Sequence, residues 1–282
     1  MVVRIVTDST ADLPAEIANT LGITVVPLTV FFGEEAYLDG VELDSASFYV
    51  KLAASKDLPR TSQPSPAAFQ EAFQRLIDEG AEAILSIHLS SKLSGTYQSA
   101  CTARDSLPES VRKVPIEIID SSSISVGMNY AIQQAARMAQ AGKNLEEIKA
   151  SAEDTLARSR ILAVLDTLEY VRRGGRIGGA SAMLGNMLSF KPIIALKDGE
   201  IVPVERPRTR AKAYARVAQL LSESGAVEHV SIVETNSEVG QQLGEAIQSV
   251  YSGELQHYDL GAVIGTHTGP GTAAIAFVIA RS

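Results

Sequence analysis

The segment that decides the fold reads Val2-Val3-Arg4-Ile5-Val6-Thr7-Asp8-Ser9-Thr10-Ala11-Asp12-Leu13-Pro14. Its apolar start, residues 2–6, predicts a buried strand. A polar turn follows, and after it a helix to residue 21, for which we expect Asp12 as the N-cap, Pro14 in the first turn and Gly22 as the stop. A strand that passes through a polar turn into a helix opens a βαβ unit, and such units build parallel sheet.

The same alternation continues through the first half of the chain. Apolar runs predict strands at 23–32, 83–89 and 114–119. Amphipathic runs predict helices at 44–55, where Asp44 is the expected cap, at 65–80, where Ser65 caps and Pro66 opens the helix, just after 95, at 124–141 and at 144–158. Residues 58–66 are rich in proline and hydroxyl side chains and predict a loop.

The second half has a mixed pattern. Strands are expected at 161–165, 230–234, 255–260 and 273–280, with a hairpin of 192–196 and 201–206 around Asp198-Gly199. Helices are expected at 168–173, 177–189, 209–224 and 237–250. We therefore predict an α/β protein of two domains: an N-terminal parallel-sheet βαβ domain, 1–158, and a C-terminal mixed α/β domain, 159–282. The loop 58–66 is expected near their junction.

Composition excludes several classes of protein. With 45% hydrophobic and 21% charged residues in 282, the chain can bury a core, which rules out disorder. Its single cysteine, Cys101, excludes an internal disulfide and a cysteine-rich zinc cluster. The first residues lack the pattern of a signal peptide, so we expect a cytoplasmic protein.

The net charge of −8 conceals a local reversal. Residues 157–216 hold twelve Lys or Arg and five Asp or Glu, a local charge of +7 that leaves −15 for the rest. One interpretation is chance clustering on solvated helix faces. The other is a docking face for a phosphate-bearing ligand or an acidic partner.

Familiar catalytic motifs are missing. The chain has no Gly-x-x-x-x-Gly-Lys-Ser/Thr phosphate loop, no Gly-x-Ser-x-Gly elbow and no His-Glu-x-x-His motif. Its four histidines, at 88, 229, 257 and 267, lack the spacing of metal ligands. Asp8, Asp12 and Asp120 lie near predicted strand ends, where capping a helix is favoured over binding a cation. We expect neither a metal nor a cofactor.

Hydroxyl-rich loops are the sequence feature that points to a binding site. They lie at the carboxyl ends of predicted strands or just before predicted helices, where ligands of open α/β sheets bind. Free backbone N–H groups at helix starts and the hydroxyls together suit an anion such as a carboxylate. For each loop taken alone, ordinary capping is the favoured explanation. The loops are 8–10, 61–62, 90–96, 120–123 and 266–268, the last with His267 beside Gly269-Pro270-Gly271.

Seven motifs, in order along nearly the whole chain, resemble the DegV family. Each motif alone is weak, whereas the ordered set is specific. They are Thr7-Asp8-Ser9-Thr10-Ala11-Asp12-Leu13-Pro14, Thr61-Ser62-Gln63-Pro64-Ser65, Ser90-Ser91-Lys92-Leu93-Ser94-Gly95-Thr96-Tyr97, Leu168-Glu169-Tyr170-Val171-Arg172-Arg173-Gly174-Gly175-Arg176-Ile177, Lys191-Pro192-Ile193, Arg206-Pro207-Arg208-Thr209-Arg210 and Gly265-Thr266-His267-Thr268-Gly269-Pro270-Gly271.

The resemblance implies a DegV-like fold that binds one long-chain fatty acid, such as palmitate, stearate or oleate, in a tunnel between the domains. It implies a carrier, not an enzyme, that presents the carboxyl group to a separate ATP-dependent fatty acid kinase and that contacts membrane surfaces transiently. Aliphatic segments such as 23–32, 182–190 and 273–280 would line the tunnel. By motif, the carboxylate is expected at Thr61, Ser62, Ser94, His267 and Thr268, and the kinase- or phosphate-facing side at Arg172, Arg173, Arg206 and Arg208.

The sequence leaves two other functions open. A hydrolase or phosphotransferase would use Ser94 as nucleophile and His267 as base, and would need these side chains in contact and a third group to orient the base. A regulator would bind nucleic acid through the basic segment 157–216, against which the overall acidity and the absence of tryptophan count.

Overall fold

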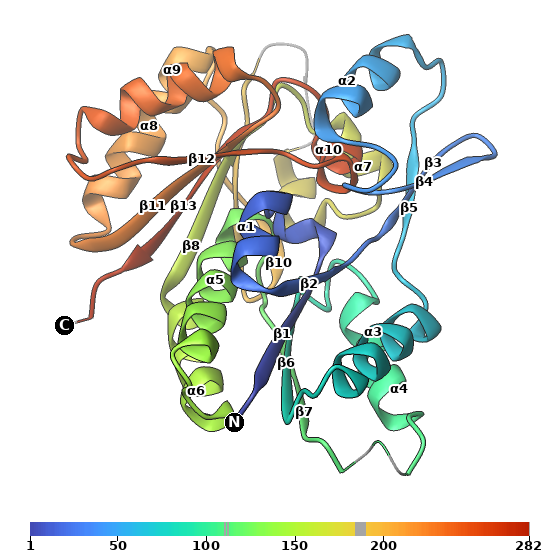
Figure 1. Cartoon of the computed structure of the whole chain (residues 1–282). Coiled ribbons are helices and arrows are strands. Elements are labelled where there is room, and N and C mark those ends of the chain that lie inside the picture. Colours follow the sequence, from blue (N-terminus) through green and yellow to red (C-terminus); the bar gives the residue numbers. More distant parts are fainter. Residues whose placement is uncertain (110, 112, 184–189, 282) are drawn as a thin grey trace.

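In the computed structural model, which describes residues 1–109, 111, 113–183 and 190–281, two sheets are stacked along the molecule (Figure 1). The first has the strand order β2-β1-β6-β7, and all its neighbouring strands are parallel, as the sequence predicts. The strands are β1 (Val3–Asp8), β2 (Ile23–Val26), β6 (Ala83–His88) and β7 (Ile116–Asp120).

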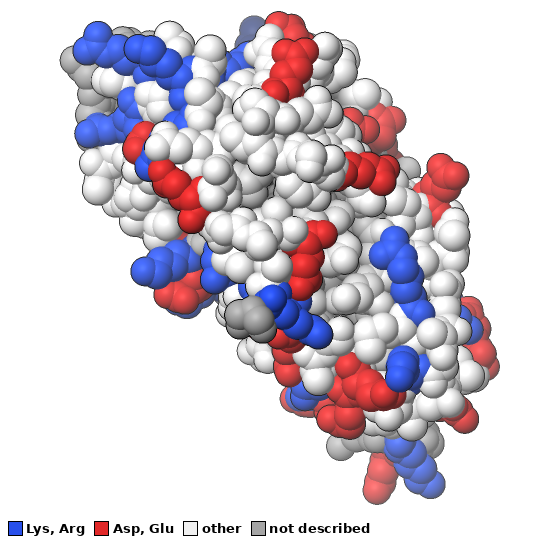
Figure 2. All heavy atoms as spheres, turned by 90° about the vertical axis from the view of Figure 1, so that its left-hand side faces the viewer, with Lys and Arg blue, Asp and Glu red and all other residues white. Residues whose placement is uncertain are grey.

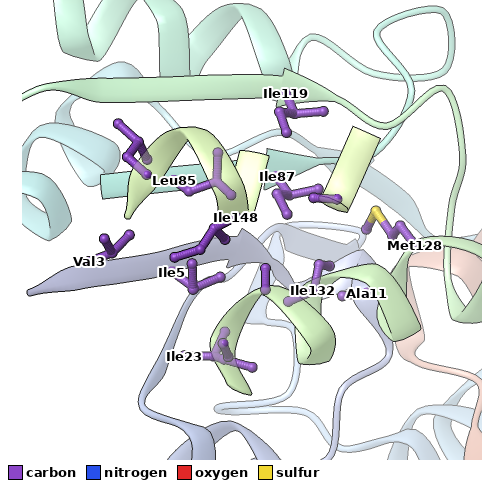
Figure 3. Packing of buried hydrophobic residues seen from close by; sticks show 14 of the residues in the cluster. Val3, Ile5, Ala11, Ile23, Leu85, Ile87, Ile119, Met128, Ile132 and Ile148 are labelled. Atoms are coloured by element: carbon purple, nitrogen blue, oxygen red, sulfur yellow. The ribbon is translucent and has the colours of Figure 1, made fainter. Parts of the chain in front are cut away.

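Helices cover both faces of this sheet, which explains the nearly uninterrupted apolar strands. Val3 and Ile5 of β1 face the helices α5 (Val126–Gln140) and α6 (Leu145–Arg158), and Figure 3 shows this cluster. Val6, one position on, faces α3 (Pro66–Asp78) and α4 (Thr96–Asp105). Alternate side chains of a strand point to opposite faces of the sheet. The apolar side chains on both faces of β1 are therefore buried.

The second sheet has six strands in the order β10-β9-β8-β13-β11-β12, and only its β11–β12 pair is parallel. This is the mixed sheet expected of the second half. The helices α8 (Arg210–Glu223) and α9 (Ser237–Gln248) pack on one face. The strands are β8 (Ser159–Val164), β9 (Ile193–Lys197), β10 (Glu200–Glu205), β11 (Val227–Glu234), β12 (Gln256–Asp259) and β13 (Ala273–Ile279). The division at 158 and 159 stays a prediction, although it coincides with the end of α6 and the start of β8.

The expected single strand 23–32 is wrong in one respect, because the chain leaves the first sheet in its middle. β2 ends at Val26, next to Pro27, which cannot donate a ladder hydrogen bond. The backbone N–H of Leu28 donates to Ser9 Oγ at 3.1 Å, and a third sheet follows. This small sheet has the order β4-β3-β5, all antiparallel, with strands β3 (Thr29–Phe32), β4 (Glu35–Leu38) and β5 (Arg60–Ser62). The strand β5 lies inside the segment expected to be only a loop.

The predicted helix caps are confirmed at two positions and wrong at a third. Asp44 caps α2 (Ser45–Ala54), and Ser65 caps α3 with Pro66 as its first residue. Asp12, expected to cap the first helix, instead ends a short 3-10 helix, η1 (Ser9–Ala11), in left-handed backbone conformation. Helix α1 (Ala15–Leu21) therefore begins without a side-chain cap.

Long-range partners explain the position of Asp12. Its carboxylate accepts hydrogen bonds from the Ser125 hydroxyl and, at 3.0 Å, from the backbone N–H of Gly261. A buried carboxylate is costly unless such donors satisfy it, and these donors lie more than 100 residues away, beyond any local pattern.

Two further segments differ from expectation. Residues 266–268, expected to be a loop, form the last turn of helix α10 (Ala262–Thr268), which ends at Gly269. The expected helix 177–189 begins as a 3-10 helix, η2 (Gly178–Met183), after α7 (Glu169–Arg173), and its residues 184–189 lie outside the described part of the chain. Across the described residues, no helix is both long enough and apolar enough to span a membrane.

Candidate ligand-binding cavity

A largely apolar cavity lies between the two main sheets. The space between its atoms measures about 970 Å³, part of which is open to solvent. Its apolar walls come from the first half of the chain (Leu28, Leu89, Leu93, Ile124), from one face of the six-stranded sheet (Ile161, Ala163, Ile194, Leu196, Ile201, Val233, Ala274) and from α10 (Val263, Ile264). We call this space the central cavity.

The polar residues of the central cavity include a pair that meets from distant parts of the chain. Thr61 projects from β5, and His267 from the last turn of α10. The Thr61 Oγ1 and His267 Nε2 atoms are 2.8 Å apart. Both side chains line the cavity, so the structure brings together two of the residues expected to hold a carboxylate.

The imidazole of His267 is neutral at physiological pH. Its burial, with Arg176 nearby, lowers its pKa to about 4. The second ring nitrogen, Nδ1, is buried without a hydrogen-bond partner in the described structure. It faces Gly174, where an added Cβ would lie 2.2 Å from Nδ1, so only glycine fits against this edge of the ring.

Ser94 reaches the cavity from the loop between β6 and α4. Its Oγ lies 2.9 Å from Thr96 Oγ1 and accepts a hydrogen bond from the backbone N–H of Thr96 at 3.3 Å. Thr96 is fully buried and begins α4. Ser94 is thus held at a helix start, where an anion is favoured.

The other expected carboxylate ligands are placed differently. Thr268 lines the cavity, but its hydroxyl already donates to the backbone carbonyl of Ile264 at 3.1 Å. Ser62 follows Thr61 in β5, and its side chain is exposed. Successive residues of a strand point to opposite sides, which explains why Thr61 faces the cavity and Ser62 does not.

The four expected arginines lie on the surface. Arg172 makes a two-pronged ion pair with Glu169 in α7, and Arg173 pairs with the same carboxylate. Arg206 donates to the Met183 carbonyl at 3.3 Å and lies over the Phe190 ring, 6.0 Å from its centre. Arg208 is exposed. Figure 2 shows Lys and Arg side chains gathered at the upper left of the face that it draws.

Arg176 and Gln63 are among the polar residues of the cavity that sequence reasoning missed. Arg176 donates to the backbone carbonyls of Leu93 and Gly174, at 3.2 and 2.6 Å. These bonds connect the loop that carries Ser94 to the C-terminal end of α7. Both residues stand inside the quoted motifs. The signal was present, because Arg176 directly follows the Gly174-Gly175 pair and Gln63 follows the two hydroxyl residues.

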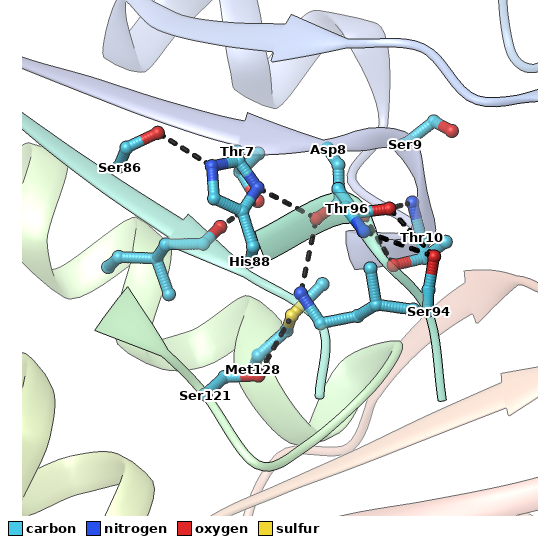
Figure 4. Close-up of polar contacts among 12 residues, drawn as sticks. Thr7, Asp8, Ser9, Thr10, Ser86, His88, Ser94, Thr96, Ser121 and Met128 are labelled. Atoms are coloured by element: carbon cyan, nitrogen blue, oxygen red, sulfur yellow. Dashed lines mark hydrogen bonds and ion pairs between the residues drawn. The ribbon is translucent and has the colours of Figure 1, made fainter. Parts of the chain in front are cut away.

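A Ser-His-Asp arrangement exists in this region, but outside the cavity. Ser86 Oγ lies 2.7 Å from His88 Nε2, and His88 Nδ1 lies 2.9 Å from Asp8 Oδ2 (Figure 4). All three residues are fully buried, so no substrate reaches the serine. Asp8 Oδ2 also accepts the backbone N–H of Leu89 at 3.1 Å, and the network therefore fixes the end of β6 that leads to Ser94.

The contacts of Ser94 and His267 bear on the hydrolase hypothesis, and the placement of His, Cys, Asp and Glu side chains bears on metal binding. The hydrolase hypothesis needs Ser94 in contact with His267, whereas among the described contacts Ser94 Oγ meets Thr96 and His267 Nε2 meets Thr61. In the described ranges 1–109, 111, 113–183 and 190–281, no cluster of three or more His, Cys, Asp or Glu side chains could hold a metal ion.

Fold and cavity together define a class of protein: an α/β molecule with an apolar cavity between a parallel and a mixed sheet, and with hydroxyl and imidazole groups at one end of this cavity. The family model described as "Uncharacterised protein, DegV family" matches residues 2–280. This chain belongs to the DegV family.

Known relatives cover the full length of the chain. A DegV domain-containing protein of Halalkalibacterium halodurans is 40% identical, with 99% of each chain covered, and the DegV protein of Bacillus subtilis is 35% identical, with 98% of each covered. A fatty acid-binding DegV family protein from Thermus thermophilus has a similar structure, with a TM-score of 0.89 at 32% identity. The match covers 99% of this chain and 100% of the Thermus chain. A stearic acid-binding protein from Eubacterium ventriosum has a TM-score of 0.91 at 28% identity, with 98% of each covered.

Proposed function

We propose that this protein binds one long-chain fatty acid in the central cavity and presents its carboxyl group to an ATP-dependent fatty acid kinase. The observation that carries the proposal is the cavity itself: aliphatic walls enclose it, and Thr61, Ser94 and His267 line it as well. The fatty acid binding of structural relatives at 28 and 32% identity supports it.

The acyl chain supplies most of the binding free energy in this proposal. Each buried methylene contributes roughly 0.8 kcal/mol, so a tail of about sixteen carbons offers far more than a few hydrogen bonds. The walls that would contact it are Leu, Ile, Val and Ala side chains, which present no polar group to the tail. Palmitate, stearate and oleate are the ligands we expect.

The carboxylate is bound by neutral donors in this proposal. The Thr61 and Ser94 hydroxyls donate to it, and His267, which is uncharged near pH 7, supports Thr61. A bidentate arginine would occupy both carboxylate oxygens, whereas hydroxyls leave one of them nucleophilic. This oxygen would attack the γ-phosphorus of ATP on the kinase, the bond to the β-phosphate would break, and ADP would leave with an acyl phosphate formed.

The surface arginines fit the partner in this scheme. Arg206 and Arg208 are exposed, and Arg172 and Arg173 share a single carboxylate, that of Glu169, so positive charge exceeds negative charge around this pair. Such a surface suits an acidic docking face or a phosphate group. We infer that the kinase approaches from this side. A brief contact with anionic membrane lipids would use the same charges.

Mass spectrometry tests the ligand. Protein purified from cells is measured intact under native conditions and again after denaturation, and we expect the added mass of one long-chain fatty acid, lost on denaturation. Absence of this mass, together with no uptake of added palmitate or oleate, would refute the proposal.

A pair of variants tests the carboxylate site. Ser94→Ala removes a cavity hydroxyl and should weaken fatty acid binding about tenfold, whereas Ser123→Ala removes a buried hydroxyl beside Gly127 and should leave binding within about twofold. The kinase step is tested by adding an ATP-dependent fatty acid kinase and measuring acyl phosphate. Equal losses in the two variants would contradict the placement of the carboxylate at Ser94.

A further inference from the structure

The tip of the β9–β10 hairpin is held by a residue from the other half of the chain. Asp198 and Gly199 form the turn, with φ of 51° and 79°. The carbonyl of Gly199 accepts a hydrogen bond from Ser90 Oγ at 2.7 Å, and Ser90 is fully buried. A Cβ on residue 199 would lie 2.5 Å from Ser90 Oγ, so the contact requires glycine for its space as well as for its backbone angle.

The same serine organises the loop that carries Ser94. Ser90 Oγ accepts the backbone N–H of Lys92 at 3.2 Å, and the Ser90 carbonyl accepts those of Leu93 and Ser94 at 3.0 and 3.2 Å. Its own N–H donates to the carbonyl of Ser123 at 2.8 Å. The hydroxyl and backbone of one residue therefore connect the hairpin tip to the loop that reaches the carboxylate end of the cavity.

The hairpin is a wall of the central cavity. Ile194, Ala195 and Leu196 of β9 and Ile201 of β10 line the space. Beyond the turn, Lys92 and Glu200 form an ion pair of 3.4 Å between exposed side chains, which contributes little stability in water. The buried Ser90–Gly199 bond is thus the stronger of these two polar contacts at the hairpin end.

We propose that Ser90 is a positioning residue that latches the β9–β10 hairpin over the acyl chain, and that separation of the hairpin tip from Ser90 limits the release of a bound fatty acid. This inference rests on the proposed function. When the latch opens, the end of the hairpin that carries Leu196 and Ile201 is free to move away from the ligand, while Ile194 stays paired with Ala163 of β8.

The latch is tested by the rate of ligand release. A fluorescent long-chain fatty acid is bound to the full-length protein and displaced by excess oleate in a stopped-flow instrument. We expect Ser90→Ala to release the probe about tenfold faster than the wild type, with the association rate changed less than about twofold. Ser91→Ala is the matched control, because this neighbour is exposed, and it should release the probe at the wild-type rate.

A second variant changes the hairpin side of the Ser90–Gly199 contact. Gly199→Ala leaves Ser90 intact, so it tests the latch even where Ser90→Ala fails to fold, and it should also release the probe about tenfold faster. Both changes break the Ser90–Gly199 contact, and alanine also strains the left-handed turn at 199. The increase in release rate in the double variant should therefore be smaller than the product of the two single increases. A general loss of stability would instead give additive effects and lowered melting temperatures.

The outcomes separate the two proposals. If the wild type binds the probe, and Ser90→Ala and Gly199→Ala release it at the wild-type rate, the latch is refuted and fatty acid binding stands. Additive rate changes in the double variant also refute the latch. A wild-type protein that binds no long-chain fatty acid overturns both.

Discussion

The hydroxyl oxygen of Thr61 lies 2.8 Å from Nε2 of His267, although 206 residues separate them in the chain. The contact joins the small sheet to helix α10, so the polar end of the cavity exists only in the complete fold. Because the neutral imidazole donates through one nitrogen, a proton on Nε2 would leave the Thr61 hydroxyl free to donate to a ligand. This arrangement suits a site for an anion.

Replacing Thr61 by valine should weaken fatty acid binding about tenfold. The change keeps the side-chain shape but removes the hydroxyl that donates to the carboxylate and contacts His267. Isothermal titration calorimetry with palmitate measures the loss. Ser62→Ala is the matched control, because Ser62 is the neighbouring residue that the sequence also proposes as a carboxylate ligand, and its side chain is exposed. We expect this variant to change the affinity for palmitate less than about twofold. An equal loss at both positions would restore Ser62 as a ligand.

Alanine at position 174 should also weaken binding, by about tenfold or more, for a steric reason. The backbone of Gly174 has a φ of −69°, which alanine adopts without strain, but the added Cβ would lie 2.2 Å from His267 Nδ1. The ring must move, and its contact with Thr61 is then lost. Displacement of a fluorescent fatty acid measures the affinity.

Gly179→Ala is the control for this prediction. A Cβ there meets its nearest atoms at 3.5 Å, an ordinary contact, so binding should stay at the wild-type level. The change in the His267 environment is observable separately, as a shifted imidazole signal in the NMR spectrum of Gly174→Ala. Normal binding by this variant would show that the position of the ring is unimportant.

Much of the fold follows from local sequence. Strands such as β1 and β6 are apolar runs flanked by turn residues, and the helices α2 and α3 begin at the predicted caps Asp44 and Ser65. The failures have long-range causes. Asp12 accepts donors from Ser125 and Gly261 instead of capping α1, and such partners leave no periodic signal.

The candidate site was only partly predictable for the same reason. The motifs name Thr61, Ser94 and His267, and the structure places all three on the cavity. Which hydroxyl of the 61–62 pair points inward depends on β5, a strand of three residues inside an expected loop. The motif containing Gly174-Gly175 points to Arg176, but the carbonyls of Leu93 and Gly174 that fix its position are brought to it only by the fold.

The stability of the protein should fall in mild acid partly because of His229. Its ring stacks on Tyr130 at 4.0 Å and is partly buried, and burial, with Arg137 nearby, lowers its pKa to about 4. Since the unfolded value is about 6.5, the folded state is stabilised above this pH, and the stabilisation is lost as the pH falls toward 4.

The variant His229→Phe isolates this effect, because phenylalanine keeps the stacking and does not titrate. Its free energy of unfolding relative to the wild type should rise by up to about 3 kcal/mol between pH 7 and pH 4. Urea unfolding at several pH values measures the difference. A difference that does not change with pH would mean that His229 titrates normally in the folded protein.

Asp39 should have the opposite effect on stability. Its side chain is buried and accepts the backbone N–H of Ala262 at 3.1 Å, at the start of α10. Burial raises its pKa to about 6, and the charge of Asp8 adds to the rise. A raised carboxyl pKa means that stability is greatest below about pH 4, the unfolded value, and falls as the pH rises through 6.

The variant Asp39→Asn should therefore gain stability relative to the wild type as the pH increases from 4 to 8, by up to about 3 kcal/mol. Asparagine keeps an oxygen for the Ala262 N–H, so the hydrogen bond that starts α10 is retained. Asp44→Asn is the control, because this exposed cap of α2 has a lowered pKa and its effect should be nearly constant between pH 5 and 8. Because α10 carries His267, unchanged fatty acid affinity of the Asp39→Asn protein would show that the position of the helix does not depend on the charge of Asp39. A stability difference that stays constant from pH 4 to 8 would contradict the raised pKa of Asp39.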